Sequence, residues 1–467
     1  MGIVFCGVVP HPPIMVPEVG RGEAGKVRAT QDALRELGRR IKESGAETLV
    51  IISPHGPVFS DAVGLIITPR SGGDLGRFGA PEAAVDRTTD LELAEAIGRE
   101  ARALDLHIVA IDEGLARRYR DLSTELDHGF VAPLYWLERG GADLPLLAVG
   151  MSLMPRDRLY AFGVAVRRAA ERLGRKAALV ASGDLSHRLT PDAPAGFHER
   201  GKEFDATVVE IFRTGEIERL LALDEVLAEC AGECGLRSMI MMLGALDGHR
   251  FASEVLSYEG PFGVGYMVAA LQPGEPDEER RLLDRLITQR RKAVEARREG
   301  ESYIVRLARR SLENYLRGEA PPDPGEIPPE FRRPAGAFVS LKKDGQLRGC
   351  IGTIAPTRPT AAEEVMENAV SAGTRDPRFF PVEIDELDEI VYSVDILGEP
   401  EPVDSLDQLD PKRYGVIVRA RGRSGLLLPD LEGIDTAEQQ VAIARQKAGL
   451  SPDEPVKLER FEVKRYR

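Results

Sequence analysis

The chain contains little cysteine and little histidine for its 467 residues. Its four cysteines, Cys6, Cys230, Cys234 and Cys350, are too few for a disulfide framework in a chain of this length. No apolar run approaches the length of a membrane span, and the apolar N-terminus lacks the basic segment of a signal peptide. We therefore expect a protein of the reducing cytoplasm without a membrane partner, rather than a disulfide-stapled secreted domain.

Basic residues are fewer than acidic residues. The chain has 62 Lys and Arg residues against 76 Asp and Glu, which gives a formal net charge of −14. This balance argues against a nucleic-acid partner held through phosphate contacts. Hydrophobic residues make up 43% and charged residues 30%, as in ordinary globular proteins, and the composition is compatible with an oligomer. The length exceeds what one hydrophobic core usually serves, so we expect two domains.

The pattern along the chain divides it into three parts. Residues 1–271 alternate short apolar runs with segments of helical spacing, which predicts an α/β domain with a mostly parallel sheet flanked by helices. Residues 272–302 open on Pro and Gly and then become dense in Arg and Glu, which predicts a charged linker helix exposed to solvent. Residues 303–467 mix strand and helix patterns, which predicts a second domain of the α+β class.

Two histidines follow two short apolar runs near the N-terminus. Residues 3–9 run into His11, and residues 48–53 run into His55. Helical spacing between Ala29 and Ile41 makes this a strand–helix–strand unit, in which both strands are parallel and end at the same edge of the sheet. We therefore expect His11 and His55 side by side, where open α/β sheets place their ligands. Two of only seven histidines at equivalent strand ends suggest a metal site.

Three further motifs carry polar groups in similar settings. His128 lies between Asp127 and Gly129, just before an apolar run, and residues 182–187 follow a strand pattern and end in His187. Gly232-Glu233-Cys234-Gly235 opens an apolar helical run. Four of the seven histidines thus lie at predicted strand ends or in loops flanked by glycine.

These motifs, in this order, resemble those of the class III extradiol dioxygenase catalytic subunits, the LigB-like family, and of its Memo-like relatives. The resemblance covers residues 1–271 and implies a small-molecule substrate. Carried over by motif, it implies that His11 and His55 are metal ligands and that His128 is an active-site histidine. It also implies that His187 is the catalytic acid or base, with Asp184 in the same motif.

The third metal ligand has two candidates. LigB-like proteins place a glutamate at the start of a late helix, Memo-like proteins place a cysteine there, and this chain has Glu233 and Cys234 adjacent. We favour Glu233, because two histidines and one carboxylate on one face of Fe(II) leave positions open for substrate and O₂. Ligation by Cys234 would shift the preference toward zinc or copper and away from oxygen activation.

The second domain carries one distinctive motif. Residues 347–353 follow an Asp-Gly turn signal and contain Arg348 and Cys350 between glycines. This heptapeptide, with several supporting segments, resembles the AMMECR-type family over residues 303–467. Cys350 is a candidate nucleophile or redox thiol, with Arg348, Arg375 and Asp376 around a polar or anionic ligand; alternatively it is a buried small thiol in a tight strand. No histidine follows His249, so no Cys–His pair forms within this domain.

The combination of these two domains resembles the components of the AmmeMemoRadiSam system. In that system, AMMECR-type, Memo-like and radical SAM proteins are associated. The chain has no Cys-x-x-x-Cys-x-x-Cys motif, so the resemblance implies a separate radical SAM partner. One hypothesis is an Fe(II)-dependent, extradiol-dioxygenase-like enzyme acting on a catechol-type or related aromatic substrate with O₂. The other is a metal-binding accessory protein of such a modification system, without ring cleavage and with zinc or copper preferred.

Overall fold

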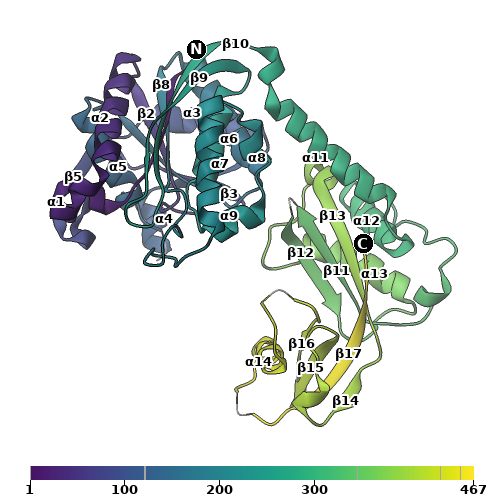
Figure 1. The fold of residues 1–467 in the computed structure, drawn as a ribbon. Coiled ribbons are helices and arrows are strands. Elements are labelled where there is room, and N and C mark those ends of the chain that lie inside the picture. The colour runs from purple at the N-terminus through teal and green to yellow at the C-terminus, as the bar shows by residue number, and fades with distance from the viewer. Residues whose placement is uncertain (1, 120–121, 344, 432, 453) are drawn as a thin grey trace. The chain divides into compact units, whose positions relative to one another are not determined.

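The computed structural model describes residues 2–119, 122–343, 345–431, 433–452 and 454–467. The chain forms two compact units, Met1–Ile287 and Thr288–Arg467, and α11 (Leu282–Glu299) runs across the division. Figure 1 traces the chain through the helices and strands of each unit.

The N-terminal unit is built on one eight-stranded sheet with the strand order β6-β3-β7-β2-β8-β1-β10-β9. Its strands are β1 (Ile3–Val9), β2 (Thr48–Ser53), β3 (Ala62–Ile66), β6 (His107–Ile111), β7 (Leu146–Gly150), β8 (Ala177–Ser182), β9 (His249–Glu259) and β10 (Tyr266–Pro276). The pairs β1–β8, β8–β2, β2–β7 and β3–β6 are parallel, while β10 pairs antiparallel with β1 and β9. This confirms the predicted α/β domain with a mostly parallel sheet.

Strand β8 lies between β1 and β2, so the two strands that end near His11 and His55 are parallel but are not neighbours. Every residue of β2 and β8 is buried, as expected for strands covered on both faces. The loop after β8 therefore emerges between the two histidines. The strand–helix–strand pattern in the sequence predicted that β1 and β2 end at the same edge of the sheet. It did not predict that β8 lies between them.

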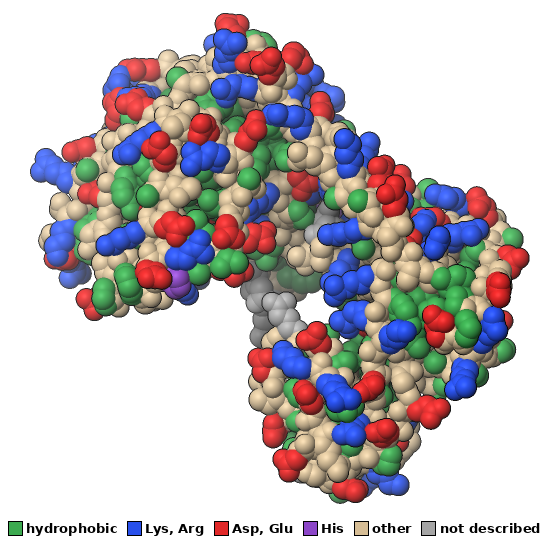
Figure 2. Space-filling model, turned by 45° about the vertical axis from the view of Figure 1, so that its right-hand side comes forward, with side chains coloured by type: hydrophobic (Ala, Val, Ile, Leu, Met, Phe, Trp, Pro, Cys, Tyr) green, Lys and Arg blue, Asp and Glu red, His purple; other side chains and the backbone are tan. Residues whose placement is uncertain are grey.

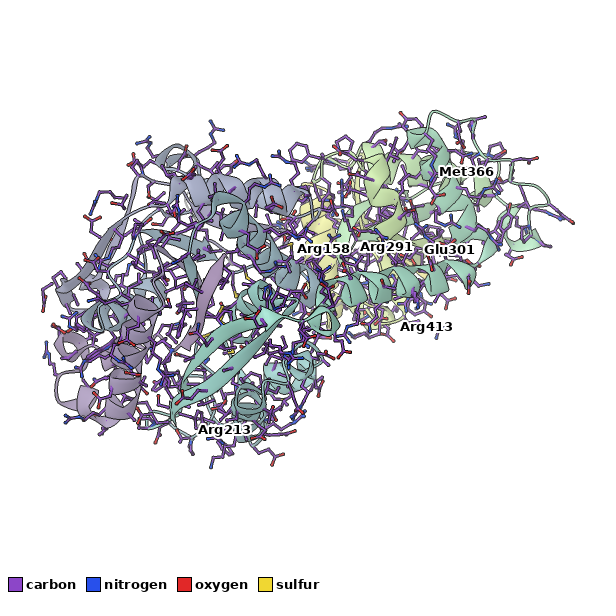
Figure 3. The ribbon with its side chains drawn as sticks, turned by 90° about the horizontal axis from the view of Figure 1, so that it is seen from above. Arg158, Arg213, Arg291, Glu301, Met366 and Arg413 are labelled. Carbon is purple, nitrogen blue, oxygen red and sulfur yellow. The ribbon has the colours of Figure 1, made fainter. Side chains whose placement is uncertain are left out.

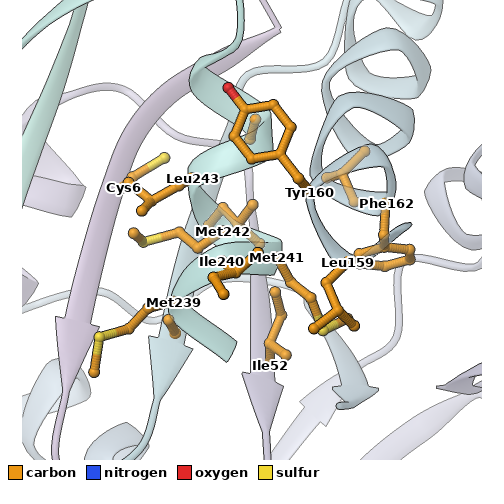
Figure 4. Packing of buried hydrophobic residues seen from close by; sticks show 14 of the residues in the cluster. Cys6, Ile52, Leu159, Tyr160, Phe162, Met239, Ile240, Met241, Met242 and Leu243 are labelled. Atoms are coloured by element: carbon orange, nitrogen blue, oxygen red, sulfur yellow. The ribbon is translucent and has the colours of Figure 1, made fainter. Parts of the chain in front are cut away.

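Helices cover both faces of the sheet, as Figure 1 shows. They are α1 (Pro17–Gly20), α2 (Arg28–Glu43), α3 (Leu91–Arg102), α4 (Glu113–Arg118), α5 (His128–Arg139), α6 (Arg156–Leu173), α7 (Arg200–Thr214), α8 (Glu218–Leu221), α9 (Glu225–Ala231) and α10 (Leu236–Leu243). Helices α3, α6 and α10 belong to one buried apolar cluster, and α2 and α5 belong to another. Figure 4 shows the first cluster, where Cys6 and Ile52 from the sheet lie with Leu159 of α6 and Met241 of α10.

A buried arginine ties α6 to the end of α3. Arg158, labelled in Figure 3, is 5% exposed, and its guanidinium donates to the carbonyl of Leu104 at 3.3 Å and to the carboxylate of Asp105 at 3.0 Å. A buried charge with these partners is compensated and hydrogen-bonded, which offsets its desolvation. The bonds fix the turn that leads from α3 into β6.

Both signs of charge are interspersed over the face of the molecule shown in Figure 2. Many charged pairs are local, such as Arg39 with Glu36 and Glu43 on α2. Exposed pairs of this kind contribute little to stability, so the apolar clusters dominate it. Within the residues described, no helix is both long and apolar enough to cross a membrane.

The C-terminal unit is built on antiparallel strands in the order β12-β11-β13-β17-β15-β16, with β14 paired to β17. Its elements are α12 (Tyr303–Leu316), β11 (Ala337–Lys343), β12 (Gln346–Thr353), α13 (Ala361–Thr374), β13 (Ile390–Leu397), β14 (Glu401–Val403), β15 (Tyr414–Ala420), β16 (Arg423–Leu427), α14 (Ala437–Lys447) and β17 (Lys457–Tyr466). Helices α12 and α13 share a buried cluster with β11 and β13, while α14 packs on β15 and β16. This confirms the α+β class.

Helices α6 and α10 approach each other closely through two glycines. A Cβ at Gly163 would lie 2.1 Å from the carbonyl oxygen of Met241, and one at Gly244 would lie 1.8 Å from that of Tyr160. No side chain fits at either position without moving the backbone. Because α10 begins just after Glu233 and Cys234, this contact fixes the position of both candidate ligands.

We expect Gly163→Ala to lower the stability of the N-terminal unit by about 1–3 kcal/mol, because the helices must move apart. The matched control is Gly98→Ala in α3, where a Cβ meets nothing within 4 Å; it should raise stability by roughly 0.5–1 kcal/mol. The chain has one tryptophan, Trp136 in α5, so its fluorescence during urea unfolding reports on this unit. Equal effects of the two substitutions would contradict the close helix contact.

Candidate metal centre

His11 and His55 meet at the carboxyl edge of the N-terminal sheet. Their Nε2 atoms lie 3.2 Å apart, and the ring of His11 meets that of His55 edge-on. His11 is 2% exposed, whereas His55 faces a pocket and is exposed. The expected pair of histidines is therefore formed, although β8 separates the strands that carry them.

Hydrogen bonds fix the tautomer of His11. Its Nδ1 lies 3.0 Å from the hydroxyl of Ser182, which itself donates to the carbonyl of Gly129 at 2.6 Å. Since the Ser182 proton is used in that bond, the hydroxyl accepts from Nδ1–H, and the lone pair of His11 is on Nε2. Burial lowers the pKa of His11 to about 4, so the ring is neutral at pH 7. A neutral ring with a fixed, outward lone pair is what a metal requires.

Cys234 completes a group of three donor atoms with the two histidines. Its Sγ lies 3.6 Å from His11 Nε2, and the donor atoms of His11, His55 and Cys234 all lie within 4.8 Å of one another. The backbone N–H of Asp184 donates to this sulfur at 3.2 Å. Burial raises the pKa of the Cys234 thiol well above its usual value, and Asp184 adds to the rise.

The distances in this group fit a four-coordinate ion. Metal–nitrogen bonds of about 2.0–2.1 Å and metal–sulfur bonds of about 2.3 Å hold tetrahedral donors roughly 3.3–3.6 Å apart. The observed separations are 3.2 Å between the histidine nitrogens and 3.6 Å between nitrogen and sulfur. A donor set of two imidazoles and one thiolate leaves the fourth position for water or substrate.

The carboxylate of Glu233, which the sequence favoured as the third ligand, is hydrogen-bonded to the start of α10. It accepts a hydrogen bond of 2.7 Å from the backbone N–H of Leu236, the first residue of α10. Burial raises the pKa of Glu233, and the hydrogen bond offsets part of the rise. The N-terminus of a helix attracts a carboxylate through its unpaired backbone N–H groups and its positive dipole end. This attraction holds the side chain of Glu233 at the start of α10. The His11–His55 group contains Cys234 in its place.

Asp184 lies between the metal group and His187. One oxygen accepts from the backbone N–H of His11 at 2.9 Å, while the other lies 3.9 Å from His11 Nε2 and 3.8 Å from His187 Nε2. Burial would raise the pKa of Asp184, but His11 and His187 outweigh it and hold the pKa below its ordinary value. The carboxylate therefore stays charged and can stabilise positive charge on a neighbouring imidazole.

The ring of His187 is oriented at both nitrogens. Its Nδ1–H donates to the carbonyl of Gly232 in a short bond, which leaves Nε2 on the side of Asp184. Burial lowers the pKa of His187, but Asp184 and the Gly232 carbonyl outweigh it and raise the pKa above its ordinary value. A histidine held in this way can accept and return a proton near neutral pH.

His128 faces the same space from another element. It begins α5, which Asp127 caps by accepting from the backbone N–H of Gly129 at 3.0 Å. The ring centroid of His128 lies 4.3 Å from that of His55 and 5.6 Å from that of His11. Burial lowers the pKa of His128 to about 4, so this ring is also neutral at pH 7. Donor atoms of His55, Asp127 and His128 form a second group within 4.8 Å.

A pocket of about 1000 Å³ opens beside these histidines. Its lining includes His55, His128, Phe59, Arg77 and Phe78. The ring of Phe78 lies edge-on to His128 with 5.3 Å between centroids. Phe78 lies in the short turn between β4 (Arg70–Leu75) and β5 (Ala80–Thr88). These two strands form a hairpin outside the main sheet. The pocket can hold a small aromatic molecule next to the donor group.

Two contributors to this site were missed by the sequence reasoning, for different reasons. Ser182 lies in the motif at residues 182–187 that ends in His187. Its role in orienting His11 depends on its hydrogen bond to Gly129, which is 53 residues away in sequence. Phe78 lies between Gly76 and Gly79, and no spacing in the sequence connects that hairpin with His128. A polar residue at the last position of a buried strand is the one signal that could have identified Ser182.

In the C-terminal unit, Arg348 is engaged away from the Cys350 thiol. Its guanidinium donates to both carboxylate oxygens of Glu386 at 2.9 and 2.8 Å, and to the carbonyl of Phe380 at 2.8 Å. These contacts hold the pKa of Glu386 at about 2, although burial acts in the opposite direction. The guanidinium of Arg348 is therefore already occupied by Glu386 and by the carbonyl of Phe380.

The chain matches two protein families in different ranges of its sequence. Residues 6–269 match the family described as the catalytic LigB subunit of aromatic ring-opening dioxygenase, and residues 305–467 match the AMMECR1 family. "Protein CA_C1420" of Clostridium acetobutylicum is 39% identical over 98% of both chains. A protein of Thermotoga maritima is 55% identical over 36% of this chain and 99% of its own length.

Two solved structures are each similar to part of the chain. The uncharacterized protein PH0010 of Pyrococcus horikoshii is 35% identical, covers 36% of this chain and 90% of its own, and has a TM-score of 0.33. The uncharacterized protein JW3007 of Escherichia coli K12 is 16% identical, covers 58% and 99%, and has a TM-score of 0.41. By its sequence, the chain belongs to the family of the catalytic LigB subunit of aromatic ring-opening dioxygenases, with an AMMECR1 domain at its C-terminal end.

Proposed function

We propose that the N-terminal unit binds one transition-metal ion through His11, His55 and Cys234 and acts on a hydroxylated aromatic molecule in the adjoining pocket. The observation that carries this proposal is the fixed tautomer of His11, whose free Nε2 lies 3.2 Å from His55 Nε2 and 3.6 Å from Cys234 Sγ. When bound, the metal would supply Lewis-acid activation of the substrate oxygen, and for iron also O₂ chemistry.

His187 would take the proton that the aromatic hydroxyl loses. Asp184, 3.8 Å from His187 Nε2, would stabilise the imidazolium that forms. His128, neutral at pH 7, would donate or accept a hydrogen bond at the pocket wall, while Phe78 would shield this side of the pocket from water. Ring opening by O₂ is the form of this reaction that the family description favours, and Fe(II) is the ion that would support it.

A second candidate function follows from Cys234. A thiolate is a softer ligand than the carboxylate of the usual iron set, and a tetrahedral nitrogen–sulfur site suits zinc or Cu(I). With such an ion, the unit would serve as a metal-binding accessory protein of a radical SAM-linked modification system, without ring cleavage. The identity of the bound metal separates the two candidates.

Metal content tests the ligand set. We expect the chain, purified without oxygen, to contain close to one metal ion, and His11→Ala and Cys234→Ala each to lose it. Glu233→Gln is the matched control, because the amide oxygen still accepts from Leu236 and leaves the three donors in place. Elemental analysis by mass spectrometry measures all four proteins. Loss of metal in Glu233→Gln with retention in Cys234→Ala would overturn the assignment.

Substitution of Ser182 tests whether its hydroxyl fixes the tautomer of His11. Ser182→Ala removes the acceptor of His11 Nδ1–H, and loss of such an outer partner weakens metal affinity about 10- to 100-fold. Ser238→Ala is the control, because Ser238 is also fully buried and its hydroxyl has no hydrogen-bond partner among the described residues. Competition with a metal chelator gives both affinities. An unchanged affinity in Ser182→Ala would show that the hydroxyl does not orient the ligand.

Turnover distinguishes the two functions. For the dioxygenase, the Fe(II)-loaded chain should consume O₂ with a catechol, and His187→Gln should reduce kcat about 100-fold or more while keeping its metal. An oxygen electrode and elemental analysis give the two readouts. If a screen of catechols with the iron-loaded chain gives no O₂ uptake, and the native metal is zinc or copper, the accessory function is the one supported.

A further inference from the structure

Asp205 is a buried carboxylate that contacts the loop carrying His187. It lies on α7 and is 1% exposed. One oxygen accepts from the backbone N–H of Ser186 at 2.8 Å, and the other accepts from the hydroxyl of Tyr258, on β9, at 2.7 Å. A buried carboxylate is costly unless it is hydrogen-bonded in this way. Since Ser186 directly precedes His187, Asp205 is bonded to the chain next to the candidate proton acceptor.

The structure leaves little room around this carboxylate. A Cβ at Gly265 would lie 2.0 Å from Oδ2 of Asp205, so a larger residue at that position would displace the carboxylate. Gly265 also pairs with the loop, because its N–H donates to the carbonyl of Ser186 at 2.9 Å and its carbonyl accepts from the N–H of Leu185 at 2.8 Å. The carboxylate, the glycine and the loop are therefore packed together.

The end of α9 holds the same loop through backbone carbonyls. The carbonyl of Ala231 accepts from the backbone N–H of His187 at 3.1 Å and from the Ser186 hydroxyl at 3.0 Å. The next carbonyl, that of Gly232, accepts from Nδ1–H of His187. The bond from the ring to Gly232 needs the backbone of the loop at its observed position. Asp205 is the side chain of α7 that fixes this position.

The charge of Asp205 strengthens its hold on the loop. Burial raises the pKa of Asp205 to about 6, while the hydrogen bonds from Tyr258 and Ser186 and the charge of His187 act in the opposite direction. Most of the carboxylate is therefore ionised at pH 7. An ionised oxygen makes a shorter and stronger hydrogen bond to a backbone N–H than a neutral one does.

We propose that Asp205, held by the hydroxyl of Tyr258, is a positioning residue for His187. It fixes the loop so that the imidazole keeps its bond to Gly232 and presents Nε2 on the side of Asp184. Within the described part of the chain, Asp205 forms no hydrogen bond or ion pair with His187 or with the three metal donors, so it acts through the loop. This inference rests on the proposed function, in which His187 accepts the proton of the aromatic hydroxyl.

The proton on Nδ1 of His187 reports on this positioning without any substrate. A hydrogen-bonded imidazole N–H exchanges slowly with water, and NMR of the full chain labelled with ¹⁵N-histidine measures its exchange rate. His187→Gln identifies the signal by removing it. We expect Asp205→Ala to raise the exchange rate about 10-fold or more, which corresponds to the loss of one hydrogen bond to a charged group. Asp205→Asn should keep the slow exchange, because its amide oxygen still accepts from Ser186.

Asp247 gives a matched control for the loss of a buried carboxylate. It is 6% exposed and accepts from the hydroxyl of Tyr160 at 3.1 Å and from the backbone N–H of Leu282 at 2.7 Å. Asp247→Ala should lower the stability of the N-terminal unit but leave the exchange of His187 Nδ1–H unchanged. A merely structural role of Asp205 would make the two alanine variants alike in this measurement.

Tyr258→Phe keeps the test decisive where Asp205→Ala does not fold. Tyr258 is 40% exposed, and this substitution removes only the hydroxyl that holds Asp205, so we expect a smaller rise in the exchange rate. The proposal is overturned if a folded Asp205→Ala leaves the exchange unchanged, or if Asp247→Ala raises it equally. Where Asp205→Ala does not fold, an unchanged exchange rate in Tyr258→Phe overturns it.

Turnover separates this proposal from the function on which it rests. If the unmodified chain consumes O₂ with a catechol, Asp205→Ala should lower kcat about 100-fold, with KM and metal content unchanged, because a small displacement of a catalytic group is costly. An unchanged kcat would overturn the positioning role. If the unmodified chain turns over no catechol, the proposed dioxygenase function fails, and the exchange rate of His187 Nδ1–H still decides the role of Asp205.

Discussion

The candidate metal centre depends on the single proton of the Ser182 hydroxyl. That proton is donated to Gly129 at the start of α5, so the oxygen receives Nδ1–H of His11 and leaves Nε2 free. The arrangement joins three elements, because Ser182 ends β8, His11 follows β1 and Gly129 is the second residue of α5. Without it, the neutral ring of His11 could present a hydrogen to the other donors instead of a lone pair.

Asp184 extends this arrangement to the acid–base side of the site. Its carboxylate accepts from the backbone of His11 and lies within 4 Å of the ring nitrogens of both His11 and His187. One charge thus influences a candidate ligand and a candidate proton acceptor together. The loop after β8 supplies both residues of this acid–base pair, which explains why the insertion of β8 between β1 and β2 matters for the chemistry.

Much of the fold was predictable because its signals are local. The short apolar runs at residues 3–9 and 48–53 coincide with β1 and β2. The meeting of His11 with His55 was also predictable, since both follow parallel strands. The position of Glu233 was not, because the sequence shows two adjacent donors and only the start of α10 decides which one turns toward the helix.

The insertion of β8 also constrains the order of events as the chain is made. Cys234 is 223 positions from His11, and the serine that orients His11 lies 171 positions away. A ribosome that has released only β1 and β2 has exposed two histidines but no closed set of donors. The three donor atoms can therefore come together only after about half of the chain has emerged and β8 has inserted between β1 and β2.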